Sequence, residues 1–167
     1  MILNTDDASD RTDNFRLIKR NRLENISQLT CSPTRSLFGW WQSYAPKTPS
    51  RKDFDITKLP KLASHIYLIE VIAPGRYLYR LCGQRAGYLI GQTHRMTEIS
   101  AKSEQVEDQK LATYLDTVIG EDTCCYCTGE LSFFEKNIMK FESVDCPLKN
   151  SDGEITHFIG VLCAVPK

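Results

Sequence analysis

The residues of this chain best suited to chemistry are three cysteines within four positions, in the run Cys124-Cys125-Tyr126-Cys127. Cys124 and Cys127 have the C-x-x-C spacing that is found in zinc sites and in redox-active thiol pairs. A structural zinc site needs four ligands, and the sequence has no second cysteine pair or histidine pair at ligand spacing. A redox- or zinc-responsive protein that uses these cysteines therefore stands as an alternative function.

The segment that carries these cysteines, residues 123–133, has the pattern of a β-strand. Side chains alternate between the two faces of a strand, so Cys124 and Cys127 are predicted to point to opposite faces. Cys125 and Cys127 share a face with Leu131, and small thiols suit an apolar face. We therefore favour a structural role for the cysteines over a redox or metal-binding one.

Other residue types that carry catalysis are scattered along the chain. His65, His94 and His157 are isolated from one another in the sequence. The chain shows no Ser-His-Asp order, no phosphate-cradling glycine loop and no His-Glu metalloprotease motif. We therefore predict no enzymatic activity, no catalytic residue and no metal ligand, and the sequence identifies no cofactor.

Aromatic residues are candidates for the lining of a pocket between the sheet and its helices, although each of them taken alone also fits an ordinary core position. Ligand sites are mostly apolar, with a few polar groups that fix orientation. The residues assigned to this predicted ligand pocket are Tyr79, Tyr88, Tyr114, Cys127 and Phe141.

Composition limits the compartment and the classes of partner. The 167 residues include 21 Lys and Arg and 21 Asp and Glu, which gives a net charge of +0. Such a chain has no overall field to attract nucleic acid or an anionic membrane, and no apolar run approaches the ~20 residues of a membrane span. The seven cysteines form no disulfide framework, and the first residues are acidic rather than signal-like. We expect a cytoplasmic protein that binds neither nucleic acid nor membrane.

The first part of the chain is interpreted as an extension. Residues 1–14 are polar and acidic, and residues 15–30 carry spaced apolar groups that suggest a short helix. We therefore predict a partly disordered N-terminal extension over residues 1–30 and a single domain over residues 31–167.

The domain is predicted to begin with a helix at Ser32-Pro33, since proline favours the first helical position. A second helix is predicted over residues 103–120. Five strands accompany these helices, and the first two form a hairpin. The predicted strands are residues 65–72, 76–82, 123–133, 138–148 and 155–165. Five antiparallel strands with helices packed on one face, together with the N-terminal flanking helix, make an α+β domain.

This order of elements is similar to that of the PAS fold, and short motifs strengthen the resemblance over about residues 32–165. They resemble a family of small single-PAS proteins of alphaproteobacteria, long described as of unknown function. The motifs are Trp40-Trp41, Pro49-x-Arg51-x-Asp53-Phe54-Asp55, Leu59-Pro60, Tyr79-Arg80-Leu81-x-Gly83, Leu89-Ile90-Gly91, Cys146-Pro147-Leu148, Asp152-Gly153 and Ile159-Gly160-Val161-Leu162.

The resemblance implies a sensory or signalling module that binds a small apolar or aromatic ligand, or a protein partner, and has no catalysis of its own. The flavin-photosensor branch has an Asn-Cys-Arg-Phe signature where this chain has Arg85-Ala86-Gly87-Tyr88, so flavin photochemistry is not expected. A ligand-free interaction scaffold is a further alternative.

Aromatic residues of the first helix indicate a partner surface. Phe38, Trp40 and Trp41 form a cluster that reads as exposed, and a stand-alone sensor passes on its signal through contact. We therefore predict that these three residues form a surface for homodimerisation or for a signalling partner.

Overall fold

The computed structural model describes residues 2–7, 11–92, 96–133 and 137–166. Within these residues the strands form one eight-stranded antiparallel sheet, in the order β1-β2-β6-β7-β8-β3-β4-β5. The strands are β1 (Ile2–Asp6), β2 (Phe15–Arg22), β3 (Ile66–Ala73), β4 (Arg76–Cys82), β5 (Glu98–Ser100), β6 (Cys125–Ser132), β7 (Ile138–Lys149) and β8 (Ile155–Ala164). The helices are α1 (Ser32–Gln42), α2 (Gln84–Ile90) and α3 (Val106–Glu121), with 3-10 turns at Ile26–Gln28, Arg51–Asp53, Ile56–Lys58 and Pro60–Leu62.

The α+β class is confirmed, but the sheet is larger than the five strands predicted. The predicted strands correspond to β3, β4, β6, β7 and β8, and the first two form the expected hairpin. The three additional strands lie at the two ends of the sheet. β5 is only three residues long, which is too short for a periodic pattern, and it pairs with β4.

The additional strands at the other end, β1 and β2, come from residues interpreted as an extension. β2 pairs with β6, and β1 pairs with β2, so this segment continues the sheet of the domain. Of the short helix suggested within residues 15–30, the structure has only a 3-10 turn at Ile26–Gln28, because Phe15–Arg22 form a strand. A bulge between Arg16 and Lys19, with Leu17 at a φ of 52°, breaks the alternation of β2 and gives its apolar residues a helix-like spacing.

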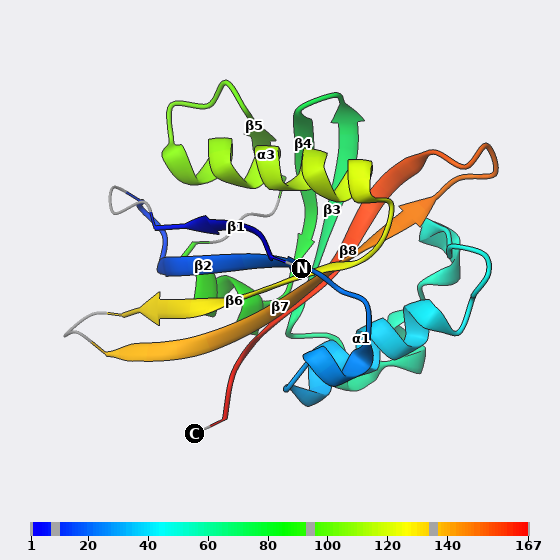
Figure 1. Cartoon of the computed structure of the whole chain (residues 1–167), viewed down its shortest axis with the longest axis horizontal. Coiled ribbons are helices and arrows are strands. Elements are labelled where there is room, and N and C mark those ends of the chain that lie inside the picture. The colour runs from blue at the N-terminus through cyan, green and yellow to red at the C-terminus, as the bar shows by residue number, and fades with distance from the viewer. Residues whose placement is uncertain (1, 8–10, 93–95, 134–136, 167) are drawn as a thin grey trace.

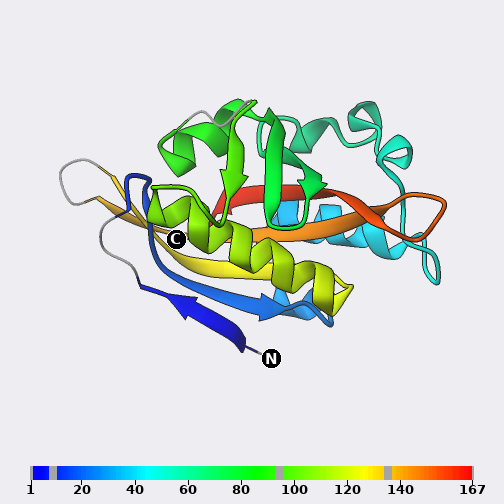
Figure 2. The same cartoon turned by 90° about the horizontal axis from the view of Figure 1, so that it is seen from above.

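Helices cover both faces of the sheet rather than one (Figures 1 and 2). Strand β7 shows the division, because its side chains alternate between two apolar cores. We call the side toward α2 and α3, which includes Phe141, the cavity face. The side toward α1, which includes Val144 and Cys146, is called the closed face.

Helix α1 is fastened to the closed face at both ends. The buried carboxylate of Glu142 accepts hydrogen bonds from the backbone N–H of Thr30 at 2.8 Å and of Cys31 at 2.9 Å, and from the Thr34 hydroxyl. A carboxylate in this place satisfies amide groups that have no partner within the helix and favours its positive end. At the other end, Trp41 Nε1–H donates to the carbonyl of Pro147 at 2.9 Å.

Helix α3 lies across the cavity face and begins and ends near its predicted limits. Tyr114, Leu115 and Val118 are buried beneath it, as its apolar spacing predicts. The helix continues past Gly120 to Glu121, and Asp122 follows it in the left-handed conformation that closes many helices. None of the helices in the described part of the chain is both long and apolar enough to cross a membrane.

Candidate functional site

A cavity of about 70 Å³ lies on the cavity face, between α3 and the sheet. Its wall combines residues of β2, β3, β4, β6, β7 and β8 with residues of α2 and α3. The polar residues of the wall are Arg11, Asp13, Arg20, Tyr67, Tyr79, Glu107, Asp108, Tyr114, Cys127, Ser143 and Asp145. Polar residues thus surround the cavity, although most of the surface that faces it is apolar.

Four of the five residues assigned to the ligand pocket meet at this cavity. Tyr79, Tyr114, Cys127 and Phe141 line it from three strands and from α3. Tyr88 lies outside it, with 59% of its surface exposed. Its neighbours in the sequence, Leu89 and Ile90, take the buried side of the short helix α2, so the ring of Tyr88 faces outward and stacks on Phe133.

The centre of the site is the carboxylate of Asp145, which is 3% exposed. The hydroxyls of Tyr67 and Tyr114 donate to its two oxygens, each at 2.6 Å. Burial raises the pKa of Asp145, although the two hydroxyls and the charge of Arg20 act in the opposite direction. Burial also raises the pKa of Tyr67 and of Tyr114 well above the usual value of 10.0, so both remain protonated donors at neutral pH.

A glycine in the neighbouring strand makes room for this arrangement. Gly160 of β8 is paired with Tyr67 of β3 and with Asp145 of β7. The ring of Tyr67 lies directly over Gly160, where an added Cβ would be only 2.2 Å from the ring. The glycine therefore allows the hydroxyl of Tyr67 to reach Asp145 across the sheet.

Two arginines from the N-terminal segment bring positive charge to the cavity. Arg11 binds both carboxylate oxygens of Asp13 at 2.9 Å and one oxygen of Asp6 at 2.6 Å. Arg20 lies 3.3 Å from the same Asp6 carboxylate, and its guanidinium lies 5.1 Å from the centre of the Tyr114 ring. Asp6 therefore holds both arginines in place, and Asp6 and Arg20 are each buried.

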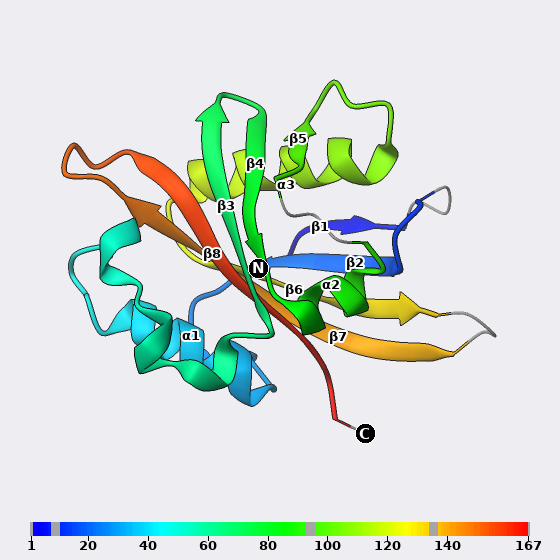
Figure 3. The ribbon, with the colours of Figure 1, turned by 180° about the vertical axis from the view of Figure 1, so that it is seen from behind.

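Residues 11–14, which we call the N-terminal arm, connect the cavity to α2 and α3. The backbone N–H of Thr12 donates to Oε1 of Glu107 at 3.2 Å, and the Thr12 hydroxyl donates to the same atom. Asn14 donates through its backbone to Ile90 at 2.8 Å and through its side chain to Leu89 at 3.2 Å. The arm thus bridges the beginning of α3 and the end of α2. Figure 3 shows these two helices from behind.

Glu107 is the residue of α3 that holds this arm. Burial raises its pKa, but hydrogen bonds from the Thr12 side chain and backbone and the charge of Arg11 outweigh burial, so the net pKa is lowered. Glu107 is therefore an ionised acceptor at neutral pH.

Sequence reasoning missed the charged residues of this site. Arg11, Arg20 and Glu107 lie in segments that read as polar extension or as an exposed helix start. Asp145 carried a usable signal, because it is a single acid within the apolar strand run Val144-Asp145-Cys146. A lone acid at a buried strand position needs hydrogen-bond donors around it, and such a requirement indicates a polar site.

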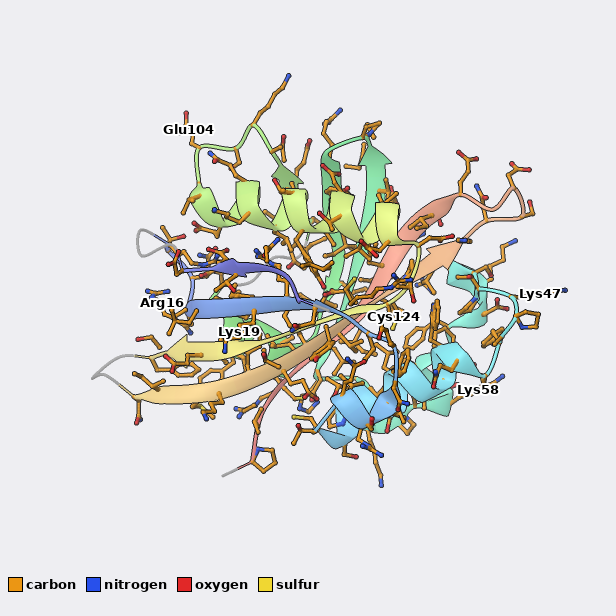
Figure 4. All side chains as sticks on the ribbon, viewed as in Figure 1. Arg16, Lys19, Lys47, Lys58, Glu104 and Cys124 are labelled. Carbon is orange, nitrogen blue, oxygen red and sulfur yellow. The ribbon has the colours of Figure 1, made fainter. Side chains whose placement is uncertain are left out.

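The cysteines point to the faces that alternation predicts, although Cys124 lies one residue before β6. Cys124 packs on the closed face (Figure 4), whereas Cys125 and Cys127 pack on the cavity face. Burial raises the pKa of all three thiols, for Cys127 to about 11, so they are not thiolates at neutral pH. In the described residues, no three His, Cys, Asp or Glu side chains come together as metal ligands. This geometry favours a structural role over a redox or zinc site.

The predicted partner surface is mostly turned into the protein. Phe38 is 2% exposed and belongs to the core of the closed face, so it is not part of an exposed cluster. Trp40 packs edge-on against Phe54 at 5.2 Å, and Trp41 is half-buried and bonded to Pro147. The aromatic residues of α1 that were predicted to be exposed pack instead on the sheet and on the loop that follows the helix.

The two histidines that the structure describes, His65 and His157, lie outside the site. Burial lowers the pKa of His65 and of His157, and His157 lies 3.8 Å from Glu70. Neither lines the cavity. His94 lies outside the described residues.

Comparison with solved structures finds distant likenesses. An RNA-binding light-oxygen-voltage receptor is 17% identical over 70% of this chain, with a TM-score of 0.44, and this chain spans only 36% of that receptor. The Rhodobacter sphaeroides LOV protein is 9% identical over 68% of this chain and 70% of its own, with a TM-score of 0.45. The PAS domain of the fruit-fly ELK potassium channel is 12% identical over 66% of this chain and 94% of its own, with a TM-score of 0.46. Likenesses at this level carry no inference about ligand or partner.

Comparison with protein families gives a clear result. No curated protein matches the chain significantly. A family model described as PAS domain matches residues 29–163, which is most of the chain and includes α1, the strands from β3 to β7 and all but the last residue of β8. This chain belongs to the PAS-domain family.

Proposed function

We propose that this PAS-domain protein is a non-enzymatic cytoplasmic sensory module whose signal is the occupancy of the cavity beneath α3. The observation that carries the proposal is the composition of the cavity wall, which combines α2, α3, the central strands and β2 around one polar centre. A molecule bound there contacts segments far apart in the sequence. Its binding energy therefore acts on the arrangement of those segments.

The N-terminal arm gives the module a route from the cavity to the surface. The arm is tied to α3 through Glu107 and to α2 through Asn14, and Arg11 and Asp13 of the arm also line the cavity. A ligand that binds better when the arm is docked stabilises β1 and β2 in the sheet. One that binds better when the arm is released favours the opposite state. Either preference changes whether β1 and β2 are held in the sheet, and so changes the surface that a partner can contact.

The hydroxyls at the cavity support binding rather than catalysis. The tyrosine hydroxyls around Asp145 have a raised pKa, so they donate hydrogen bonds and exchange no proton near neutral pH. Asp145 itself accepts both of these bonds and is buried beneath them. These hydroxyls can turn from Asp145 toward a bound molecule, which suits binding.

A matched pair of variants on α3 tests the proposal. Leu111→Phe places a ring at the cavity wall, whereas Thr113→Phe places the same ring on the exposed side of the helix. We expect a screen of small fragments by protein-observed NMR to give saturable shifts of cavity residues in the wild type and in Thr113→Phe. The Leu111→Phe variant is expected to lose them.

A ligand-free scaffold predicts a different result. Fragments would then cause no saturable shift in any of the three proteins, and native mass spectrometry would give the mass of the bare chain. That combination would contradict the proposed function.

Homodimerisation and a signalling partner remain predictions. With Phe38 buried, a dimer surface on α1 would have to use the exposed parts of Trp40 and Trp41. Light scattering over a wide concentration range checks this, and a monomer throughout would count against it.

A further inference from the structure

Part of the cavity wall comes from a segment that lies outside the residues matched by the family model. The match begins at residue 29, whereas β1, the N-terminal arm and β2 precede it. Arg11 and Asp13 of the arm line the cavity, and Thr12 between them is bonded to Glu107 of α3. The arm is therefore a piece of wall that is added to the matched domain.

This added piece is held mainly by polar contacts. Among the described side chains of β1 and the arm, only Leu3 is apolar, and it packs partly buried against the core of the cavity face. By contrast, β2 packs Phe15 and Ile18 against the same core and pairs with β6. β1 is the edge strand of the sheet, beside β2 (Figures 1 and 2). Segments with few buried apolar contacts open more readily than core strands, so β1 and the arm separate from the wall at the lowest cost.

The polar contacts that hold this segment are themselves costly to form. The side chains of Arg11, Arg20 and Asp6 are almost fully buried, and the attraction between buried charges is largely offset by their loss of hydration. Docking also leaves Nε of Arg20 and Oε2 of Glu107 buried without a hydrogen-bond partner among the described residues, which lowers the stability of the docked state. Release of β1 and the arm returns these groups to water. The docked and released states are therefore closely balanced.

The cavity with the arm docked is too small for an aromatic ring. Its volume of about 70 Å³ is less than half of the ~150 Å³ that admits benzene. Most of the surface that faces it is apolar, which suits an uncharged apolar molecule. An aromatic molecule therefore fits only when part of the wall moves. α3 is anchored by the buried side chains of Tyr114, Leu115 and Val118, so the arm moves at lower cost.

We infer that β1 and the N-terminal arm are a displaceable cover of the cavity, and that an uncharged aromatic molecule binds there by releasing them. The inference rests on the proposed function and specifies its ligand class and the direction of its signal. The bound molecule lies against Phe15, Leu111 and Phe141 of the wall. Only the released form binds it, so the apparent dissociation constant equals the intrinsic one divided by the released fraction.

A variant that loosens the cover tests this linkage, with indole as the aromatic probe. Asp6→Asn weakens the contacts of Arg11 and Arg20 to β1 without changing a residue of the cavity wall. Because a larger fraction of the protein is then released, we expect indole to bind about fivefold or more tightly than to the wild type. Asp7→Asn makes the same change at the next residue, which is exposed, and is expected to leave indole binding unchanged. Amide spectra verify that both variants are folded.

A covalent lock makes the opposite test and does not depend on Asp6. Thr5 and Lys19 are exposed partners across β1 and β2, and neither lines the cavity. The double variant Thr5→Cys with Lys19→Cys places two thiols at neighbouring strand positions, within reach of a disulfide. We expect its oxidised form to bind indole at least about tenfold more weakly than its reduced form. Lys19→Cys alone, under the same oxidising conditions, is the control.

Hydrogen exchange reports the release directly. Saturating indole is expected to speed amide exchange in β1 and in the arm of the wild type and to leave it unchanged in β7. A molecule that bound the docked form would slow exchange in β1 and the arm instead, and that result would overturn the inference.

The outcomes separate this inference from the proposed function. If the oxidised and reduced forms of the locked variant bind indole equally, or Asp6→Asn binds it no more tightly than Asp7→Asn, the cover is not displaced and the inference is wrong. The inference is also wrong if small fragments bind the cavity and indole does not. In these cases a cavity sensor remains. If neither indole nor any fragment shifts cavity residues, the inference and the proposed function are both wrong.

Discussion

Two carboxylates three residues apart on β7 have opposite surroundings. Glu142 faces the closed face and is 1% exposed, and Asp145 faces the cavity face and is 3% exposed. The partners of Glu142 are two backbone N–H groups and the hydroxyl of Thr34, all at the start of α1. The partners of Asp145 are two tyrosine hydroxyls that reach it from β3 and α3. The two acids are equally buried, and their partners differ.

This difference suggests that Glu142 has a structural role, whereas Asp145 belongs to a binding site. Backbone donors are fixed by the fold, so Glu142 joins α1 to the sheet in a single arrangement. Side-chain hydroxyls can rotate and can exchange one acceptor for another, so the surroundings of Asp145 can adapt to a guest. The closed face therefore serves stability, and the cavity face keeps polar groups within reach of a small cavity.

The largest expected effect tests whether the Tyr67 ring is held in a fixed position on the cavity face. Gly160→Ala places a Cβ within 2.2 Å of the Tyr67 ring, which cannot shift without leaving Asp145. We expect a loss of roughly 3 kcal/mol or more in the free energy of unfolding, measured by urea denaturation. Gly39→Ala on α1 is the control, since its Cβ would meet nothing within 4 Å and alanine favours a helix. Equal stability of the two variants would show that Tyr67 moves freely.

The next effect tests how strongly Glu142 attaches α1 to the sheet. In Glu142→Gln the amide NH₂ would face the N–H groups of Thr30 and Cys31, donor against donor. The helix start would also lose a negative charge. We expect a loss of about 2–3 kcal/mol in thermal or urea unfolding. A cost below that of Asp145→Asn would reverse the proposed contrast between the two faces.

The fold was predictable where apolar periodicity is strong. The hairpin of β3 and β4, the strands β6 to β8 and α3 all follow simple alternation or helical spacing. Strand β2 escaped because its bulge at Leu17 disturbs the two-residue period on which strand prediction depends. Strand β1 escaped because it is short and polar, and its place is set by pairing with β2.

The site was predictable only in its aromatic part. Tyr79, Tyr114 and Phe141 could be assigned to a pocket because they lie on elements with clear periodicity. The polar part depends on contacts between residues far apart in the sequence, such as Thr12 with Glu107. No local pattern carries that information, because the arm is placed beside α3 by the pairing of β2 with β6, which joins segments far apart in the sequence.

A smaller effect is expected at Asp145. Because burial raises its pKa above the usual 3.8, the folded state loses stability as pH rises from that value through the folded pKa. Asparagine resembles the protonated acid and does not titrate. We therefore expect Asp145→Asn to cost about 1 kcal/mol or less at pH 7, and its stability relative to the wild type to improve as pH rises from about 3.8. Urea midpoints measured from pH 3.5 to 7.5 check this, and an opposite slope would contradict it.

The smallest effect concerns the arm. The pKa of Glu107 is lowered from its usual 4.5, so Glu107 contributes stability above that pH and loses it as pH falls through the folded pKa. Glu107→Gln should therefore cost about 1 kcal/mol or less near neutral pH and nothing at pH well below 4.5. Because the contact ties only the arm to α3, hydrogen exchange should be faster in β1 and β2 of the variant and unchanged in β7. Faster exchange spread evenly over the sheet would mean that the arm is part of the core, and the cavity face would then be as fixed as the closed face.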